Sequence, residues 1–331
     1  MSEKLLSVLV VGCGRIAGGA GLSSRNGEAL THAAAYDADG RFQISACVDP
    51  DPERRQKFAE TWRAGAAYPD LDAALSSGDS FDVVSICAPS QLHGPLLAQL
   101  LDTDVGVVLC EKPLTTDLAE AERLVAAFDA ADKPLAVGYT RRWHRGVQAV
   151  AEELRSGKWG RIRSAHARYA RGIRNSGGHI IDLLHMLVGP MSVRYAGNAR
   201  HDYLADDPTL DAVLVAGDDI SVHLMGGDGN DYGLLEVQLM TENGAITLED
   251  WVTRVRRRET VPYRYAPHMQ TLDAGTWEDV GAGGSFEAMI DNIYRTVTEG
   301  VRPASDGRSA LAAQRIVEEL IVRAEQSGST A

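Results

Sequence analysis

The sequence predicts an α/β protein that begins with a doubly wound parallel sheet and continues as an α+β domain with a large, mostly antiparallel sheet. In the first 140 residues, short segments rich in Val, Ile and Leu alternate with helical patterns, which is typical of parallel strands covered on both faces. Beyond residue 140, longer alternating segments are separated by turn signals such as Gly-Gly-Asp-Gly, which indicates antiparallel strands. We therefore expect two domains, 1–140 and 141–331, with the last helix as a candidate to pack back on the first.

The first domain is expected to alternate strands at 5–11, 42–48, 82–88, 105–110 and 135–139 with helices at 52–62, 95–101 and 117–132. Proline near the first turn favours the starts of the first two helices, and an apolar stripe from Leu118 to Phe128 favours the third. In the second domain we expect helices at 146–154, 285–299 and 308–325, and strands at 161–171, 192–199, 212–216, 220–225, 234–240, 245–249 and 252–258.

Composition narrows the class of protein. The formal net charge of −13 disfavours nucleic acid and anionic membranes as partners. No apolar run approaches the roughly 20 residues that a membrane span requires. The four cysteines show neither a CxxC pair nor a metal-ligand spacing, so we expect buried thiols in a reducing cytoplasm and no metal.

A glycine-rich turn follows the first strand, with the sequence Gly12-Cys13-Gly14-Arg15-Ile16-Ala17. This is the GxGxxG/A fingerprint of a dinucleotide-binding Rossmann domain. Gly12 allows the tight turn, Gly14 lets the backbone approach a pyrophosphate, and Ala17 permits close packing of a helix on the strand. We expect the pyrophosphate to lie at a helix N-terminus. The predicted cofactor contacts are therefore Gly12, Gly14, Arg15, Ile16 and Ala17.

The second strand ends in an acid, Asp49, which is expected to bind the ribose hydroxyls and to favour NAD over NADP. Asp49 lies 37 residues after Gly12 rather than the usual ~20. The segment 18–31 has the character of an insertion that accounts for most of the excess. Arg54 and Arg55 lie close enough in sequence to serve a 2′-phosphate, so NADP stays open as the cofactor.

Four motifs, taken in order, resemble those of the Gfo/Idh/MocA oxidoreductase family, which includes glucose-fructose oxidoreductase and inositol dehydrogenase. They are Gly12 to Ala17, Ala88-Pro89-Ser90-Gln91-Leu92-His93, Glu111-Lys112-Pro113 and Gly138-Tyr139-Thr140-Arg141-Arg142-Trp143. The resemblance extends to Gly300-Val301-Arg302-Pro303 and Asp306-Gly307 near the end of the chain. It spans nearly the whole sequence and is specific for the family but not for a substrate.

The resemblance implies that Lys112 polarises or positions the reacting hydroxyl or carbonyl beside the nicotinamide. It implies that Ala88, Pro89 and His93 line the cofactor channel, with Glu111 beside it. It also implies that the second sheet is open-faced and serves substrate binding and assembly, as a homodimer or homotetramer.

The family's second catalytic motif is an Asp, three residues and a His, and here the matching residues are Asn175 and His179. Asn175 therefore replaces an acid, and an amide orients a group without accepting its proton. His179 is the predicted general acid/base, because histidine titrates near neutral pH. Asp182 lies three residues on, where a helix would place it near His179, and a structural role for it stays open. His185 is expected to be structural.

Substrate contacts are predicted at Arg142, Trp143, Arg168 and Tyr169. Arginines gather at 161, 163, 168, 171 and 174, with others at 141, 142 and 145. Such a cluster suits an anionic or highly hydroxylated substrate, such as a uronic acid or a nucleotide-linked sugar. On a strand, residues 161, 163 and 171 would share one face, and His166 and Arg168 the other. Surface salt bridges are the alternative explanation for the cluster.

The expected activity is hydride transfer between NAD, or NADP, and a secondary alcohol or ketone of a sugar, inositol, uronic acid or nucleotide sugar. Two alternatives remain at this point. One is an NAD-dependent, redox-assisted glycoside hydrolase or eliminase, which would turn over without net NADH. The other is a non-catalytic sensor of sugar or cofactor with the same fold, which the change to Asn175 favours and the presence of Lys112 disfavours.

Overall fold

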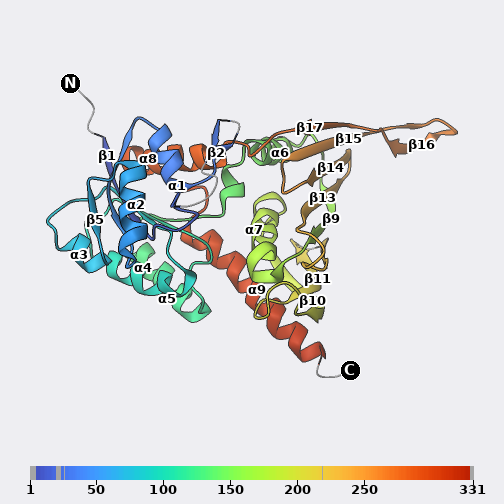
Figure 1. Cartoon of the computed structure of the whole chain (residues 1–331). Helices are drawn as coiled ribbons and strands as arrows, with labels where there is room; N and C mark the ends of the chain where they lie inside the picture. Colours follow the sequence, from blue (N-terminus) through green and yellow to red (C-terminus); the bar gives the residue numbers. More distant parts are fainter. Residues whose placement is uncertain (1–4, 20–23, 26, 218, 329–331) are drawn as a thin grey trace. The chain divides into compact units, whose positions relative to one another are not determined.

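The computed structural model describes residues 5–19, 24–25, 27–217 and 219–328 (Figure 1). The chain divides into two compact units. The first comprises residues 1–143 and 284–311, and the second comprises residues 144–283 and 312–331. A late segment, 284–311, thus groups with the N-terminal sheet, and the division falls after Leu311.

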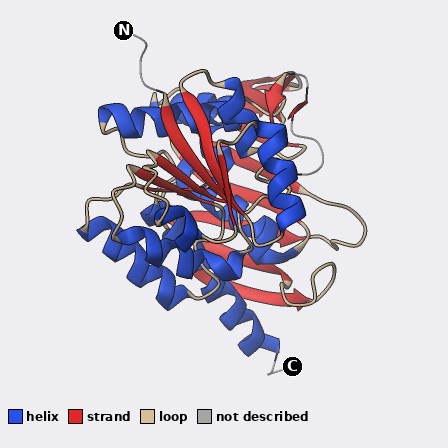
Figure 2. Cartoon of the chain, turned by 60° about the vertical axis from the view of Figure 1, so that its left-hand side comes forward, coloured by secondary structure: helices blue, strands red, loops and turns tan. Residues whose placement is uncertain are grey.

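The first unit is built on a parallel sheet with the strand order β5-β4-β1-β6-β7-β8. Its strands are β1 (Leu6–Val11), β4 (Phe42–Val48), β5 (Ala66–Tyr68), β6 (Val83–Ile86), β7 (Val107–Cys110) and β8 (Leu135–Val137). Val8, Leu9 and Val10 are fully buried, as expected for a central strand. The chain leaves β1 for β4 on one side and later returns to β6 on the other, which makes the carboxyl ends of β1 and β6 the switch point where such sheets bind ligands. Figure 2 shows strands in red and helices in blue, with helices packed beside the strands.

Helices flank this sheet, and their starts follow from local sequence. They are α1 (His32–Ala38), α2 (Pro52–Trp62), α3 (Leu71–Leu75), α4 (His93–Leu101), α5 (Leu118–Ala130) and α8 (Ser285–Glu299). The carboxylates of Asp51, Asp70 and Asp117 accept backbone N–H bonds at the starts of α2, α3 and α5. The short hairpin β2 (Ser24–Arg25) and β3 (Glu28–Ala29) precedes α1.

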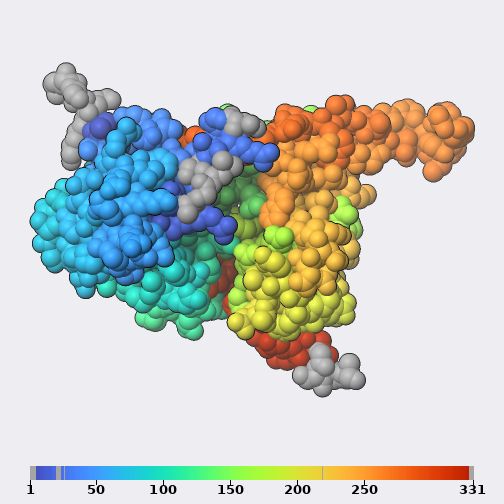
Figure 3. All heavy atoms as spheres, in the orientation of Figure 1, coloured from blue at the N-terminus to red at the C-terminus, as the bar shows by residue number. Residues whose placement is uncertain are grey.

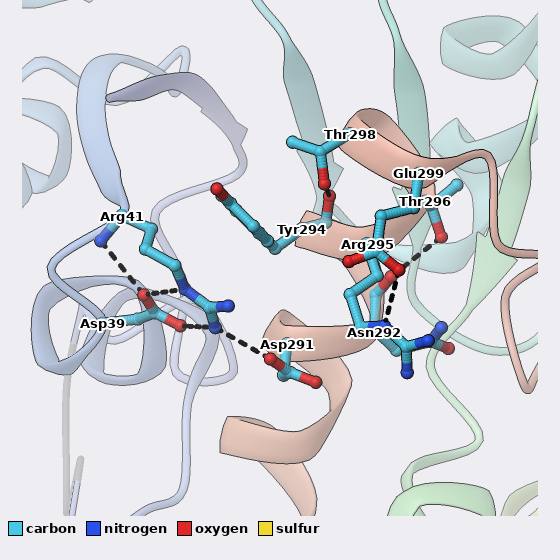
Figure 4. A network of polar contacts seen from close by, with 9 residues as sticks. All are labelled: Asp39, Arg41, Asp291, Asn292, Tyr294, Arg295, Thr296, Thr298 and Glu299. Atoms are coloured by element: carbon cyan, nitrogen blue, oxygen red, sulfur yellow. Dashed lines mark hydrogen bonds and ion pairs between the residues drawn. The ribbon is translucent and has the colours of Figure 1, made fainter. Parts of the chain in front are cut away.

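A charged network fastens α8 to the sheet despite their distance in sequence (Figure 4). The Arg41 guanidinium donates to Asp39 at 2.9 and 2.6 Å and to Asp291 at 3.0 Å, and it stacks 4.2 Å from the centre of the Tyr294 ring. Arg41 holds the pKa of the Asp39 carboxyl below its usual range. Two-pronged pairing with Asp39 fixes the orientation of the Arg41 guanidinium just before β4. The single bond to Asp291 and the contact with the Tyr294 ring then tie α8 to this end of the sheet.

The second unit contains a larger sheet with the strand order β10-β11-β12-β9-β13-β14-β15-β16, and β17 also pairs with β15. The strands are β9 (Ile162–Tyr169), β10 (Met191–Arg200), β11 (Thr209–Ala216), β12 (Ile220–Gly226), β13 (Leu235–Thr241), β14 (Gly244–Glu249), β15 (Arg254–Tyr263), β16 (Ala266–Leu272) and β17 (Thr276–Asp279). Pairing is antiparallel except between β9 and β12. The helices are α6 (Arg145–Arg155), α7 (Gly178–Leu187) and the main part of α9 (Gly307–Gly328).

The two faces of this sheet differ. On β9, Ala165, Ala167 and Tyr169 are fully buried, while His166 and Arg168 point to the opposite, accessible face. His166 stacks there on His223 of β12, with ring centres 5.2 Å apart. The second sheet is therefore open-faced, as the family resemblance implied.

Several elements were not predicted. Pro267 lies inside β16 and argues against a strand in sequence, because proline cannot donate to the ladder. The strand β17, the short β5 and α3, and α1 with its preceding hairpin were also missed. Across the described residues, none of the helices combines the length and apolarity that a membrane-spanning helix requires.

Candidate active site

The glycine-rich turn has the backbone shape that its sequence predicts. Gly12 has a φ of 92°, and a Cβ there would lie 2.6 Å from the backbone N of Ala88. Gly14 is the opposite case, because among the described residues nothing lies within 4 Å of a Cβ built on it. Gly12 is thus required because any side chain there would collide with Ala88. Gly14 leaves its backbone accessible, so that a ligand can approach it closely. This combination fits a dinucleotide pyrophosphate.

The helix expected after this turn is interrupted, and the interruption falls in the segment 18–31, which the sequence predicts to be an insertion. A single turn covers residues 15–18, and α1 begins only at His32. The N–H groups of His32 and Ala33 donate to the carbonyls of Ile16 and Ala17 at 3.1 and 3.0 Å. That is the i→i−4 pattern of one helix with twelve extra residues inserted. Without those twelve residues, Asp49 would follow Gly12 by 25 residues, close to the usual ~20.

Asp49 lies directly after β4 and is 4% exposed. One carboxylate oxygen accepts the N–H of Cys13 at 2.9 Å, and the other accepts the N–H of Asp51 at 3.0 Å. Arg54 approaches the same carboxylate at 3.7 Å. Each carboxylate oxygen keeps further acceptor capacity, so the group braces the glycine-rich turn and is still suited to accept from a ribose hydroxyl.

Lys112 lies two residues beyond β7, at the carboxyl edge of the sheet, and is half-buried. The bond from Lys112 to Pro113 is cis. Two neighbours hold this turn. The ring nitrogens of His93 lie 2.7 Å from the carbonyl of Pro113 and 3.0 Å from the carbonyl of Ala88. His93 is 1% exposed, so its ring joins the Ala88-Pro89 turn to the Lys112 turn from within the protein. The family resemblance implied that it lines the cofactor channel, and its burial gives it a supporting position behind that channel instead.

Glu111 braces the same turn from the other side. Its carboxylate accepts the N–H of Lys112 at 3.3 Å and lies 2.9 Å from Nε2 of His32. A Cβ at Gly138 would come 2.7 Å from this carboxylate, which explains the glycine in that motif. Sequence reasoning missed His32, because it lies just after the insertion and its partner is 79 positions away.

His32 is fully buried, and its ring packs edge-on against Phe286. Burial lowers its pKa, whereas Cys87 and the hydrogen-bonded Glu111 raise it, with a net pKa of about 10. A raised pKa in the folded state means that protonated His32 stabilises the fold. This contribution is complete below the ordinary value of 6.5 and is lost as the pH rises through about 10.

We therefore expect the melting temperature of the wild type to fall more between pH 6.5 and pH 10 than that of His32→Gln. The extra fall in the wild type is the contribution of protonated His32. Melting temperatures of both proteins across this range provide the measurement. His201→Gln, which changes an exposed histidine, is the control and should keep the wild-type slope. A constant difference between wild type and His32→Gln across the range would contradict the account.

In the second unit, a π-helix at Gly172–Gly177 runs directly into α7. Buried Asp207 holds its start, accepting the N–H of Arg174 and of Asn175, each at 2.8 Å. Gly172 has a φ of 84°, and a Cβ there would lie 2.1 Å from the Asp207 carboxylate. Turns of π-helix occur frequently at functional sites. Asp207 was also missed by sequence reasoning, because its sequence neighbourhood carries no motif.

The π-helix and α7 position the residues of the predicted second catalytic motif. Asn175 is exposed in the π-turn, and its side-chain amide donates to the carbonyl of Arg171 at 3.2 Å. His179 is half-buried in the first turn of α7, and Asp182 is 1% exposed on the same helix. A carboxylate buried this deeply has a structural part in the unit, whatever it contributes beside His179.

Most of the predicted substrate contacts are buried or engaged in other interactions. Trp143 is 4% exposed and donates to Asn292 of α8 at 2.9 Å, so it is a core residue of the first unit. Tyr169 is fully buried and donates to the carbonyl of Leu210 at 2.8 Å. Arg168 pairs with Glu236 on the open face, away from the side where Tyr169 meets Gly177. Arg142 remains half-buried in the 3-10 turn Thr140–Trp143.

The arginine cluster is also dispersed. Arg161 and Arg163 both pair with Glu242, and Arg174 pairs with Glu318. Arg171 lies beyond the end of β9 with a φ of 71° and stacks 4.7 Å from the Tyr203 ring, so it does not share a strand face with 161 and 163. Salt bridges and stacking account for these arginines, as the alternative explanation held.

Comparisons with known proteins bear on this site. Residues 6–139 match the model of an oxidoreductase family with an NAD-binding Rossmann fold, Gfo/Idh/MocA. D-apiose dehydrogenase of Paraburkholderia graminis is 26% identical, over 93% of this chain and 86% of that protein. Inositol 2-dehydrogenase of Corynebacterium glutamicum is 33% identical, over 36% of this chain and 35% of its own length.

The fold as a whole is shared with solved structures. WlbA dehydrogenase from Bordetella pertussis, in complex with NADH and UDP-GlcNAcA, superposes with a TM-score of 0.77, over 99% of this chain and 97% of that one. Its sequence identity is 21%, so this likeness concerns the fold.

Proposed function

We propose that this chain is a Gfo/Idh/MocA oxidoreductase, because residues 6–139 match the model of that family, and that it transfers a hydride between a nicotinamide cofactor and a secondary alcohol or ketone of a sugar-type substrate. The supporting observation is the turn of Lys112, which His93 and Glu111 brace at the carboxyl edge of a sheet whose glycine-rich turn fits a dinucleotide. Inositols, sugars, uronic acids and nucleotide sugars form the substrate class, in line with the names of the relatives.

Each proposed catalytic residue has one task. The bound cofactor supplies the hydride chemistry at nicotinamide C4. The Lys112 ammonium lowers the pKa of a substrate alcohol in one direction and polarises the ketone in the other. His179 accepts the hydroxyl proton and returns it in the reverse reaction. Asn175 and Asp182 orient His179, since an amide holds a geometry without taking the proton.

We propose NAD as the cofactor, because a carboxylate at Asp49 repels a 2′-phosphate. Asp49→Asn should therefore shift the ratio of kcat/KM for NADP over NAD upward by roughly tenfold or more, as removal of a buried charge allows. Arg54, which approaches Asp49 at 3.7 Å, is then the cation that meets the phosphate.

Initial rates with both cofactors test this prediction, and the double variant Asp49→Asn/Arg54→Met is the matched control. The gain should disappear in the double variant. An unchanged cofactor ratio in Asp49→Asn would count against the role of Asp49.

We also propose that the protein acts in the cytoplasm as a homodimer or homotetramer that binds neither nucleic acid nor membrane. Four free, buried cysteines suit a reducing compartment, and the net charge of −13 disfavours polyanionic partners.

The proposed activity is tested with NAD and NADP against a panel of inositols, pentoses, hexoses, uronic acids and nucleotide sugars. Absorbance of the reduced nicotinamide is the readout, with Lys112→Ala as the control. Reduction that depends on Lys112 is the expected result. The proposed dehydrogenase activity would be contradicted if the cofactor binds but no compound of the panel changes its redox state, in either direction of the reaction.

A non-catalytic sensor is the second candidate, and one observation favours it. Asn175 stands where the family carries an acid, and its amide is engaged with the backbone of Arg171. A sensor would bind sugar or cofactor without turnover, and Asn175→Asp would not create a rate. For the proposed enzyme, Asn175→Asp should retain or raise the rate.

A further inference from the structure

A projecting hairpin is the least explained feature of the second unit. We call residues 261–271 the arm; it contains the outer end of β15, the turn and most of β16 (Figures 1 and 3). Up to Glu259, β15 pairs with β14, and beyond that point the described ladder partner is β16. At about 3.3 Å per residue, the arm extends roughly 13 Å past the sheet.

The arm has no core of its own. Every residue from 261 to 271 is exposed or half-buried. A two-stranded hairpin without a packed face is marginally stable in water. Packing the arm against another surface would supply the burial that its own unit does not provide.

Its outer end carries the side chains that anchor protein interfaces. Tyr265 is 71% exposed, Met269 53% and Tyr263 37%. The two tyrosine rings meet edge-to-face at 5.5 Å, and Arg264 stacks 4.4 Å from the Tyr265 ring. Tyr, Met and Arg are enriched in interface cores, and Tyr and Arg dominate binding hot spots.

The arm is unsuited to pairing through its backbone. Pro262 and Pro267 lie one on each strand and remove backbone donors from it. An added strand would therefore find an incomplete ladder on either edge, so recognition must come from the side chains.

The charge of the arm favours an acidic partner. The arm carries Arg264 and His268 and no acidic residue, in a chain with a formal net charge of −13. We propose that the arm docks onto a second copy of this chain. A two-fold arrangement, in which each copy gives an arm and receives one, satisfies both arms at once. This proposal rests on the homo-oligomer proposed above and not on the proposed activity.

A complementary surface exists on the same unit. Glu236, Glu249 and Asp250 line a shallow groove together with Trp251, which is 37% exposed. Burial and the carboxylates of Glu249 and Asp250 raise the pKa of Glu236, although Arg168 pairs with it. An arriving Arg264 would relieve this repulsion, and Tyr265 would meet Trp251. The groove is thus our assignment for the docking surface on the partner copy.

Sedimentation equilibrium of the purified full chain, without substrate or cofactor, tests the first step. We expect a dimer whose Kd rises at least tenfold in Tyr263→Ser/Tyr265→Ser. Val322→Ser removes a 52% exposed apolar side chain from α9 and should leave the Kd unchanged. A monomeric wild type at tens of micromolar would overturn the arm and the homo-oligomer together. An unchanged Kd in the double variant would overturn the arm alone.

A photo-reactive phenylalanine analogue at position 265 tests the assigned surface. Irradiation should give a covalent dimer whose cross-linked peptide falls within residues 233–251, while the same analogue at position 322 should give none. Within one chain this contact is out of reach, because Arg254 pairs with Glu249 and Tyr265 lies eleven residues further along the hairpin. Cross-links confined to other peptides, or no dimer, would overturn the assignment.

Discussion

Replacing Lys112 with alanine is expected to lower kcat/KM by roughly 10³-fold, the usual loss when a positioned charge that stabilises the transition state is removed. The side chain leaves a turn that is held from two sides, by His93 through two carbonyls and by Glu111 through the backbone N–H of Lys112. These contacts do not use the Lys112 ammonium, so the turn should survive the substitution. The loss should therefore appear in catalysis rather than in folding.

Steady-state kinetics and fluorescence titration of NADH provide the two readouts for Lys112→Ala. Cofactor affinity should change far less than kcat/KM. Lys57→Met, which removes an exposed lysine from α2, is the control and should behave as the wild type. Full activity in Lys112→Ala, or a loss explained entirely by weaker cofactor binding, would remove Lys112 from the catalytic role.

Replacing His179 with alanine is expected to lower kcat by roughly 10²–10⁴-fold, the range for losing a general acid/base. His179 sits in the first turn of α7, directly after the π-turn that Asp207 holds. Because the small alanine leaves space at a half-buried position, added imidazole should restore part of the rate. Rescue of this kind depends on proton transfer and would not follow from a purely structural loss.

His185→Ala is the matched control, since His185 lies in the last turn of the same helix. His185→Ala should lower thermal stability, and added imidazole should not increase its rate. Equal rescue of both variants, or no loss of rate in His179→Ala, would contradict the assignment of the proton to His179.

Most of the fold could be predicted because its signals are local. The bounds of β4, α2 and α8 agree with those expected from the sequence, where apolar periodicity and a proline near the first turn of α2 are local signals. The glycine-rich turn was equally readable, since Gly12 and Gly14 act through backbone shape. Elements whose stability depends on distant partners were harder, as the edge strand β5 and the proline-containing β16 show.

The residues that support the site from a distance could not be predicted from sequence for the same reason. His32 pairs with Glu111, and Asp207 holds the backbone of Asn175, across chain separations that no local pattern records. Trp143 and Tyr169 were expected as substrate contacts and are buried. A large aromatic residue beside a motif has the same sequence signature whether it faces a ligand or the core. Only burial separates the two cases.

The account's central claim is hydride transfer from a carbinol carbon to the nicotinamide, and isotope transfer tests it most directly. The substrate identified from the panel would carry deuterium on the reacting carbon, and the reduced cofactor would be analysed by mass spectrometry. The account predicts reduced cofactor that is one mass unit heavier, formed by the wild type and not by Lys112→Ala. Product that accumulates without any labelled reduced cofactor would contradict it and would point instead to redox-assisted cleavage with no net NADH.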